Sequence, residues 1–338
     1  MTYNQIRESI LAQWAEPGGQ HIVFDIVGKP GGGKSACARD IMRSPALNLD
    51  FVVEFNGSIR DTVDLMGLPI HHRDGQFTQW LPPEEFWRLR EGRVGLIIEE
   101  LSDCPVPMQN ALCRVIYDNI AGSLPLSPTT FKVATSNSTE HKSGATRKTT
   151  KLSNRMRRID FHENLEEWVS WAIQAGLKDW TIDFLKFRPE LFCDFDPNRD
   201  INPTPRAWER VSAVPDTLID VGGLFYEHVT GDVGPGPAAE YTAFVRMAKD
   251  LPDPYVMLQA PDKAMVPTKQ DVLYAVLGAL ARLTAQDLSL ADAFNTYLRR
   301  LPKEYRILGM NDAQTRNPKI AETKAYSTWT ADNYDAFL

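Results

Sequence analysis

The stretch GKPGGGKS, residues Gly28 to Ser35, decides the fold of this 338-residue chain. Its spacing matches G-x-x-x-x-G-K-[ST], the phosphate-binding P-loop. The apolar run at residues 21–27 predicts a buried strand before it, and residues 36–42 predict a helix after it. In that context the glycines let backbone N–H groups surround a phosphate, and the helix N-terminus adds a favourable dipole. The motif therefore predicts a nucleotide site, with Lys34 on the β- and γ-phosphates and the Ser35 hydroxyl on Mg²⁺.

Strand and helix patterns alternate through the first half of the chain. An amphipathic helix is expected at residues 4–14, before the first strand. Alternation of this kind predicts an α/β fold, with a five-stranded parallel sheet flanked by helices and joined by right-handed crossovers. The run 94–98 is almost wholly apolar, as expected of a strand buried on both faces. The four further strands are expected at residues 51–55, 94–98, 131–135 and 158–161.

After about residue 162 the strand patterns stop, and the second half is expected to be all-α. The Gly- and Pro-rich run 229–237 is expected to form a loop between helices. Trp168, Trp171 and Trp208 are expected to pack the core of this half, as large aromatic side chains usually do. The last forty residues lack strong periodicity, so they are expected either to dock as a tail or to form a partly ordered extension. The expected helices cover residues 165–175, 180–187, 205–214, 238–251 and 269–284.

The composition is that of a globular protein, 43% hydrophobic and 24% charged with a net charge of −7. A dedicated duplex-DNA binder is usually basic, so nucleic acid is not the expected partner. No apolar run reaches the length of a membrane span, and the first residues lack a signal-peptide core, so no membrane association is expected. Cys37, Cys104, Cys113 and Cys193 form no C-x-x-C pair. Buried, reduced thiols at Cys37 and Cys113 predict a reducing cytoplasm.

Polar residues follow the strands at 94–98 and 131–135. Because the carboxyl ends of parallel strands meet at one edge, these residues are expected beside the P-loop. Glu99 is expected to hold Mg²⁺, usually through water, and Glu100 to orient and deprotonate an attacking water, since successive strand residues face opposite sides. Two solvated acids at a strand end are the alternative, which the apolar character of the strand disfavours. Asn137 can position water, although Ser-Asn-Ser is also ordinary turn chemistry.

A basic segment, Lys151 to Arg158, follows a polar loop at residues 138–150. An arginine close to a nucleotide site can act as a finger that neutralises the charge developing in the transition state. A basic solvated surface explains the same residues equally well when they are considered alone.

Residues 68–80 place Asp74-Gly75 between two β-competent arms, which is a strong signal for a tight hairpin. His71 and His72 are neighbours on one arm and would face opposite sides of a strand. They are therefore not expected to chelate one metal ion together.

Taken in order, these motifs resemble those of AAA+ ATPases, and within that superfamily those of the MoxR-like, dynein-related branch. The matching motifs are GKPGGGKS as Walker A, GLIIEEL as Walker B, Asn137 as sensor 1, LSNRM as the finger region and NPTPRAWERV as sensor 2. The resemblance covers roughly residues 20–215. It implies a P-loop core over residues 1–162, an α-helical lid over 163–299 and a C-terminal extension over 300–338.

The resemblance also implies the cofactors, ATP and Mg²⁺, and the residues that serve them. Glu100 matches the catalytic glutamate, and Glu99 stands where the family has aspartate, from where its longer side chain can still reach a water on Mg²⁺. Arg155 matches the finger that one subunit donates to its neighbour, and Arg206 the lid arginine that contacts the γ-phosphate within the same subunit. Arg147, Arg157 and Arg158 are weaker finger candidates. The nucleotide-binding residues implied are Gly28, Pro30, Gly31, Gly32, Gly33, Lys34, Ser35 and Ala36.

The function implied is that of an ATP hydrolase acting as a remodeller or chaperone. Its partners would be other copies of itself, in a hexameric ring with composite ATP sites, and a client protein, often one with a von Willebrand factor A-type domain. The task implied is maturation or metal insertion, with the hairpin residues Ile70 to Phe77 touching substrate at the pore. A nucleic-acid motor subunit and a monomeric P-loop kinase remain open. The acidic balance disfavours the motor, the paired acids and sensors disfavour the kinase, and the lack of N-K-x-D disfavours a GTPase.

Overall fold

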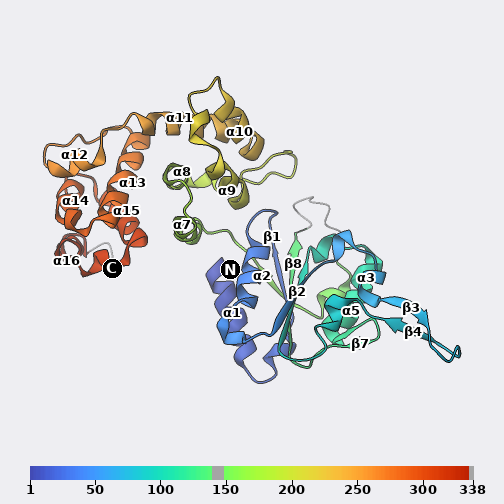
Figure 1. The fold of residues 1–338 in the computed structure, drawn as a ribbon. Helices are drawn as coiled ribbons and strands as arrows, with labels where there is room; N and C mark the ends of the chain where they lie inside the picture. The colour runs from blue at the N-terminus through green and yellow to red at the C-terminus, as the bar shows by residue number, and fades with distance from the viewer. Residues whose placement is uncertain (139–147, 335–338) are drawn as a thin grey trace. The chain divides into compact units, whose positions relative to one another are not determined.

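The computed structural model describes residues 1–138 and 148–334. The chain divides into two compact units. The first contains Met1–Asn164 and Phe195–Asp200, and the second contains Leu165–Asp194 and the chain from Ile201 onward. Figure 1 shows the first as an α/β unit, coloured blue to green, and the second as a helical unit. Each unit has its own buried apolar clusters.

The first unit is built on a five-stranded sheet in which all strands run parallel, as predicted. The strand order is β2-β5-β8-β1-β9, so β8 lies between the P-loop strand β1 and the acidic strand β5. Gly28 at the end of β1 is level with Asn137 at the end of β8. The five strands are β1 Phe24–Gly28, β2 Phe51–Asn56, β5 Val94–Glu99, β8 Thr130–Asn137 and β9 Arg157–Asp160.

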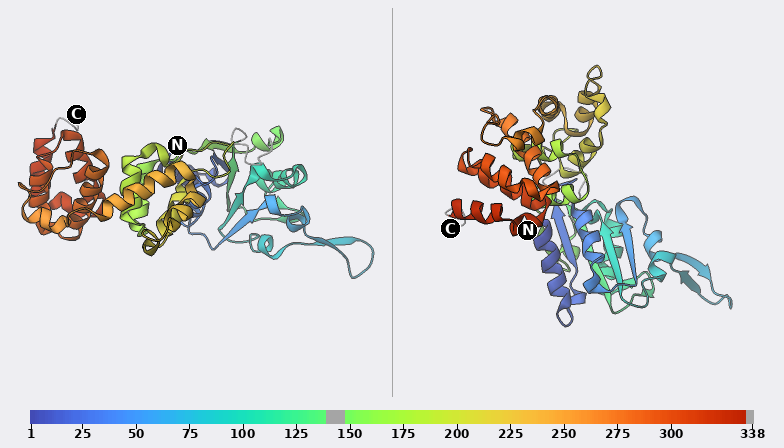
Figure 2. Two further views of the ribbon diagram at one scale, coloured as in Figure 1. Left: turned by 90° about the horizontal axis from the view of Figure 1, so that it is seen from above. Right: turned by 60° about the vertical axis from the view of Figure 1, so that its left-hand side comes forward.

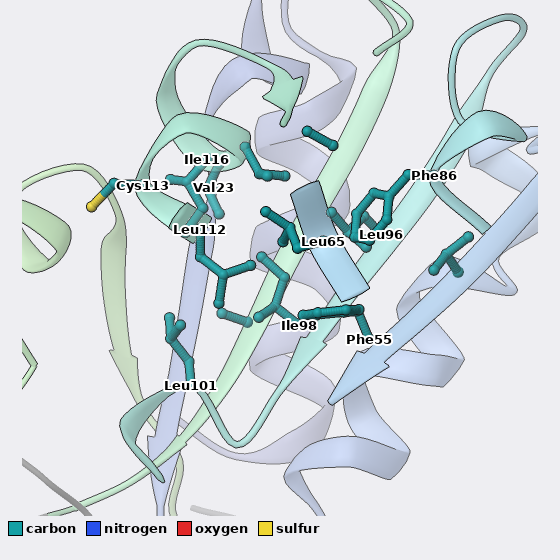
Figure 3. Close-up of a cluster of buried hydrophobic side chains, with 14 of the residues drawn as sticks. Val23, Phe55, Leu65, Phe86, Leu96, Ile98, Leu101, Leu112, Cys113 and Ile116 are labelled. Atoms are coloured by element: carbon teal, nitrogen blue, oxygen red, sulfur yellow. The ribbon is translucent and has the colours of Figure 1, made fainter. Parts of the chain in front are cut away.

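Helices cover both faces of this sheet, α1 and α2 one face and α5 the other (Figure 1). Successive side chains of β5 point to opposite faces of the sheet and so contribute to both apolar cores. Ile97 belongs to the cluster beneath α1 and α2, whereas Leu96 and Ile98 belong to the cluster beneath α5 that Figure 3 shows. Full burial of one such side chain stabilises the fold by about 1.5–3 kcal/mol. The helices of this unit are α1 Tyr3–Ala15, α2 Lys34–Met42, α3 Val63–Met66, α4 Glu84–Trp87, α5 Val106–Tyr117 and α6 Thr150–Ser153.

The predicted hairpin is present as β3 (Leu68–His71) and β4 (Thr78–Leu81), which project from the rest of the unit in both views of Figure 2. The expected tight Asp-Gly turn is wrong. The last strand pair joins His71 to Thr78, so residues 72–77 form a wider loop. The His72 N–H donates to Phe77 O at 3.0 Å, and the two rings stack beside this bond with 4.2 Å between their centroids. A second short hairpin comprises β6 Ile120–Ala121 and β7 Leu124–Pro125.

The second unit contains helices and 3₁₀ turns and no strand among its described residues, as predicted. Trp208 is fully buried against Phe184 and Tyr241. None of the helices described in either unit has the length and apolar character needed to cross a bilayer. The helices are α7 Leu165–Gln174, α8 Asp179–Phe187, α9 Pro205–Ala213, α10 Leu224–Val233, α11 Pro235–Lys249, α12 Pro254–Gln259, α13 Gln270–Gln286, α14 Ala291–Leu298, α15 Lys303–Arg316 and α16 Lys324–Asp332.

Two expectations for this unit are wrong. The run 229–237 is not a loop, because α10 ends at Val233 and α11 begins at Pro235, which leaves Gly234 alone between them. Proline is tolerated in the first turn of a helix, where its missing N–H is not needed. Trp171 is 43% exposed, since the buried stripe of α7 runs through Val169 and Ala172.

For the C-terminal residues the sequence leaves open a docked tail or a partly ordered extension, and the structure decides between these as far as residue 334. They form α15 and α16, and their side chains Met310, Ala313 and Trp329 are buried in one cluster with α13 and α14. This segment is therefore docked into the helical unit. All four cysteines lie among the described residues, with Cys37 and Cys113 buried as predicted.

Candidate nucleotide site

The P-loop joins β1 to α2, and its backbone depends on glycine. Gly31 and Gly33 have φ angles of +73° and +109°, in the left-handed region that side chains disfavour. A Cβ at Gly32 would lie 2.3 Å from Glu163 Oε1, so a side chain there would require the Glu163 carboxylate to move. Lys34 then begins α2, whose first N–H groups have no partner within the helix. The loop thus forms an anion site at a helix N-terminus.

Lys34 links the P-loop to the neighbouring strand. Its ammonium donates hydrogen bonds to Gly28 O at 3.0 Å, to Lys29 O at 2.6 Å and to Asn137 Oδ1 at 3.0 Å. Lys34 is only 8% exposed, so these oxygens compensate its loss of water. A phosphate oxygen is a stronger acceptor for an ammonium than a neutral carbonyl. The structure therefore brings two predicted site residues, Lys34 and Asn137, into direct contact.

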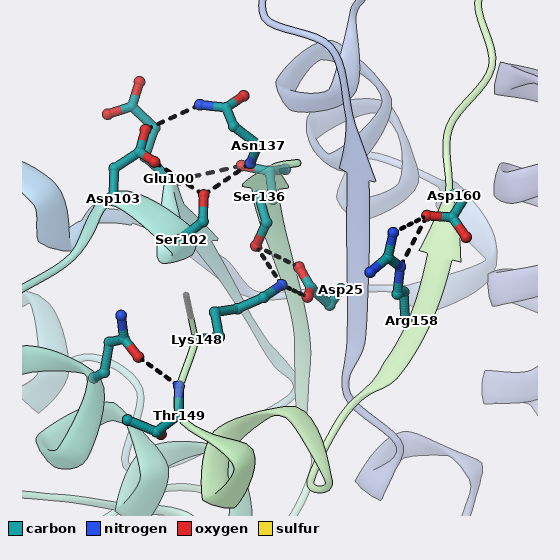
Figure 4. A network of polar contacts seen from close by, with 12 residues as sticks. Asp25, Glu100, Ser102, Asp103, Ser136, Asn137, Lys148, Thr149, Arg158 and Asp160 are labelled. Atoms are coloured by element: carbon teal, nitrogen blue, oxygen red, sulfur yellow. Dashed lines mark hydrogen bonds and ion pairs between the residues drawn. The ribbon is translucent and has the colours of Figure 1, made fainter. Parts of the chain in front are cut away.

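Asn137 is held in one orientation by the turn that follows β5 (Figure 4). Its Nδ2 donates to Asp103 Oδ2 at 2.9 Å, and its backbone N–H donates to Ser102 Oγ at 2.8 Å. Ser102 in turn donates to Asp103 Oδ1 at 3.0 Å. With Nδ2 directed to Asp103, the amide oxygen of Asn137 faces Lys34.

Glu99 faces the α2 side of the sheet. Its Oε1 accepts a hydrogen bond from Arg39 Nη2 at 2.8 Å, and Arg39 Nε also binds Glu54 Oε2 at 2.8 Å. Alternation along β5 explains this direction, since Ile97, two residues earlier, also faces α2. The carboxylate predicted to serve Mg²⁺ is thus engaged by an arginine in this structure.

Glu100 occupies an unusual backbone conformation at the end of β5. Its φ is +53°, in the left-handed region that residues other than glycine seldom adopt. Its Oε2 accepts hydrogen bonds from Asn56 Nδ2 at 3.1 Å and from Ser58 Oγ at 2.7 Å; Asn56 is the last residue of β2, and Ser58 lies just after it. Strained residues persist where their surroundings hold them, and they cluster at functional sites.

The residues at this edge fit a magnesium ion that arrives with phosphates. Ser35 lies half-buried in the first turn of α2, and its hydroxyl makes no hydrogen bond to a described residue. No cluster of three metal-binding side chains occurs within residues 1–138 and 148–334. Mg²⁺ is typically bound by one or two protein groups together with substrate phosphates and waters. Ser35 and the nearby acids suit that arrangement, with Glu99 the predicted water-mediated ligand.

Arg155, the predicted finger, lies between α6 and β9 and packs against the end of α5. Its Nη1 is 3.4 Å from Cys113 O, and its guanidinium lies over the Tyr117 ring, 4.4 Å from the centroid. Tyr117 is 68% exposed, so this arginine stands at a surface. Within residues 1–138 and 148–334, one long bond to a carbonyl and one aromatic face use only part of the donor capacity of a guanidinium.

The other arginines lie elsewhere. Arg157 donates to Gln13 Oε1 at 2.6 Å, and Arg158 binds Asp160 Oδ1 at 2.6 and 2.8 Å. Arg147 lies outside the described residues. Arg206 is exposed in the first turn of α9, in the second unit, and its role toward the nucleotide stays a prediction.

A buried ion pair lies beside this site and was not singled out from the sequence. Asp25 in β1 is 2% exposed and accepts hydrogen bonds from Ser136 Oγ at 2.6 Å and from Lys148 Nζ. Lys148 Nζ also bonds Ser136 Oγ at 3.1 Å (Figure 4). Removing one partner of a buried pair typically costs about 3–5 kcal/mol. An aspartate inside the apolar run 21–27 was the available signal, because a buried carboxylate requires a partner.

Asn56, Ser58 and Asp103 were also missed. Each lies at or just after the carboxyl end of a strand, so the rule that pointed to Glu100 and Asn137 applied to them as well. Asn, Ser and Asp are also the residues that ordinary turns favour, so the sequence does not distinguish a site role from a turn role at these positions.

The chain matches no protein-family model and no curated protein. Among solved structures it is similar to NtrX from Brucella abortus, with 15% identity, a TM-score of 0.36 and coverage of 98% of this chain and 67% of that one. It is similar to a point mutant of RuvB from Thermotoga maritima, with 13% identity, a TM-score of 0.36 and coverage of 97% and 86%. It is also similar to a putative ATPase from Cytophaga hutchinsonii, with 12% identity, a TM-score of 0.34 and coverage of 98% of this chain and 88% of that one. Likeness at this level assigns no family.

Proposed function

We propose that this chain is a Mg²⁺-dependent ATP hydrolase of the AAA+ class, in the MoxR-like branch that its motifs resemble. The observation that carries the proposal is the 3.0 Å contact between Lys34 Nζ and Asn137 Oδ1. It joins the phosphate loop to the sheet edge at which β5 also ends, with Glu100 as the next residue. A nucleotide with its β- and γ-phosphates at Lys34 would thus present its terminal phosphate to groups able to position water.

The proposed roles follow from chemistry and placement. Glu100 is the base that orients and deprotonates the attacking water, with Asn56 and Ser58 holding its carboxylate at the sheet edge. Asn137, fixed by Asp103, aligns the water or the γ-phosphate. Lys34 stabilises charge that develops on the phosphate oxygens. Mg²⁺, bound through Ser35 and through water on Glu99, would supply further charge neutralisation.

We further propose a homo-oligomer, a hexameric ring in the cytoplasm with ATP sites shared between neighbours. Arg155 would act on the neighbour's nucleotide. Its half-buried position beside the exposed Tyr117 ring supports this, because a phosphate is a far stronger acceptor than its present carbonyl partner. Residues 163–299 would serve as the lid, with Arg206 on the γ-phosphate of its own subunit, and residues 300–338 would extend it.

The client is proposed to be a protein rather than nucleic acid, for instance one with a von Willebrand factor A-type domain that undergoes maturation or metal insertion. Many of the exposed large apolar side chains lie on the hairpin β3–β4 and in the residues just before and after it, and exposed apolar surface of this kind marks protein contacts. Contact at residues 70–77 is therefore proposed. The exposed side chains of this region are Ile59, Val63, Met66, Leu68, Ile70, Phe77, Trp80, Leu81 and Trp87.

The deciding experiment measures phosphate release from Mg²⁺-ATP per chain over a wide range of protein concentration. A shared site predicts that specific activity rises and then saturates as neighbours assemble. Lys34→Ala should abolish release at every concentration. A flat, non-zero specific activity would contradict the shared site and favour a self-contained P-loop enzyme. Stimulation by added DNA would favour the nucleic-acid motor instead.

A further inference from the structure

Asp25, Ser136 and Lys148 join three segments of the first unit that have separate proposed roles (Figure 4). Asp25 lies in β1, three residues before the P-loop begins at Gly28. Ser136 directly precedes Asn137 at the end of β8. Lys148 begins the stretch that leads through α6 to Arg155. One small polar cluster thus joins the strand that leads into the phosphate loop, the strand that ends in Asn137 and the segment that leads to Arg155.

The charges in this cluster are well removed from solvent. The Asp25 side chain is 4% exposed and the Lys148 side chain 15%. Stability alone does not require such a pair, because an apolar pair of the same size is often as stable. Apolar packing tolerates several side-chain arrangements. An ion pair bridged by a hydroxyl holds its three side chains in one relative orientation, because its hydrogen bonds require specific distances and angles.

The segment after Lys148 depends on tertiary contacts for its position. Helix α6 spans Thr150–Ser153, far too short to be stable alone. The Thr149 N–H donates to Gln109 Oε1 of α5 at 3.1 Å, and Leu152 is fully buried beneath the helix. Lys148 supplies the contact at the start of this segment, and Arg155 stands just beyond its end. A shift at Lys148 would therefore be passed to Arg155.

We propose that the Asp25–Lys148 ion pair positions Arg155 for action on the neighbouring subunit's nucleotide. Through β1 and β8, the pair couples a chain's own phosphate site to the finger that the chain donates. This inference rests on the proposed function. Lys148 is a positioning residue, because it acts through α6 rather than on the nucleotide.

The test uses the double variant Asp25→Asn/Lys148→Met in the full chain. It removes both charges together and nearly preserves side-chain size, so no lone buried charge remains. We expect turnover to fall on the order of a hundredfold, since a displacement of about 1 Å near a catalytic group can cost that much. Binding of a fluorescent ATP analogue and the melting temperature should stay close to wild type. Lys151→Met, which removes an exposed charge from α6 itself, is the matched control and should keep full turnover.

Mixing then separates a defect in the finger from a defect in the chain's own site. Chains carrying Glu100→Gln have an inactive site of their own but an intact finger segment. Added to the double variant, they should restore turnover per double-variant chain, as they should for Arg155→Ala tested in parallel. Recovery of Arg155→Ala without recovery of the double variant would overturn this inference and leave the proposed function standing.

Failure of both mixtures to recover would refute the finger in trans and this inference with it. Wild-type turnover by the double variant would also overturn the inference. If the double variant does not fold, Ser136→Ala replaces it in the same mixtures. That change removes the hydroxyl that bonds Asp25 and Lys148 without leaving a lone charge. The same recovery of turnover in the mixtures supports the inference, and the same lack of recovery overturns it, although the loss of turnover should be smaller.

Discussion

Glu100 combines a strained backbone with a carboxylate held at the sheet edge. A left-handed conformation at a residue other than glycine costs of order 1–3 kcal/mol. The conformation ends β5 and starts the 3₁₀ turn Leu101–Asp103, so the chain leaves the strand plane at this residue. The same turn delivers Asp103 to Asn137. One strained residue therefore places two acidic groups at the nucleotide edge.

Glu100→Gln tests the proposed base. Glutamine has the same shape, and its amide oxygen can still accept from Asn56 and Ser58, so we expect ATP to bind normally. Turnover should fall by about 10²–10⁴-fold, the usual contribution of general acid–base catalysis. Phosphate release and retained ATP after rapid filtration measure the two effects. Glu91→Gln, at an acid whose side chain is 79% exposed, should match wild type. Undiminished turnover by Glu100→Gln would remove Glu100 as the base.

The sequence predicts site residues where the chemistry requires one residue type at a fixed spacing. The P-loop lysine and Asn137 are such residues, and they meet in the structure. Asp25 and Lys148 are 123 positions apart in sequence. Their pairing depends on how the finger segment folds back over β1, which no local pattern encodes.

At the scale of elements, burial on both faces made the strands predictable. Because β5 packs against α2 on one face and α5 on the other, nearly all of its residues are apolar, and the sequence shows a continuous apolar run. Helix boundaries were harder, because proline both stops a helix and begins one. Pro235 begins α11, whereas the sequence favoured a loop there. In the hairpin loop, His72 and Phe77 are joined by a backbone hydrogen bond and a ring stack, a pairing that the Asp-Gly turn rule does not include.

Two helical glycines make a matched test of packing between elements. A Cβ at Gly278 of α13 would lie 2.3 Å from the Asp183 carboxylate of α8, whereas Gly231 of α10 faces open space. We expect Gly278→Ala to destabilise the chain by about 1–3 kcal/mol through overpacking. Gly231→Ala should stabilise it by up to about 1 kcal/mol, because alanine is the better helix former. Urea unfolding followed by circular dichroism measures both. Changes of the same sign would show that helix propensity, and not the α8–α13 contact, decides at Gly278.

At the scale of the whole molecule, the two units handle buried charge differently. The first keeps Asp25 paired with Lys148 beside its proposed chemistry. The second gathers several charges between α8, α13 and α15, with no proposed catalytic role. Asp183 lies at their centre, and burial raises its pKa to about 7, with the nearby Asp312 charge adding to the effect. The charges around it are Asp179 and Lys186 of α8, Arg282 of α13, and Asp312 and Arg316 of α15.

The raised pKa of Asp183 makes the stability of the helical unit depend on pH. An unfolded aspartate has a pKa of about 4, so between about pH 4 and 7 the folded state binds this proton more strongly. Its contribution to stability is complete below that range and is lost as the pH rises through about 7. Asp183→Asn cannot ionise, so the variant should gain stability relative to wild type as the pH rises from 5 to 8.5. Denaturant unfolding midpoints across that range measure the gain.

Asp262→Asn, at an exposed aspartate of the same unit, is the control and should follow the wild-type curve. Parallel curves for wild type and Asp183→Asn would contradict the prediction. They would mean that Lys186 and Arg316 keep Asp183 ionised in the folded chain despite its burial. The cluster would then be a charge-balanced network whose stability is insensitive to pH near neutrality, and the missing hydrogen bond at Asp183 Oδ1 would be offset by those two cations.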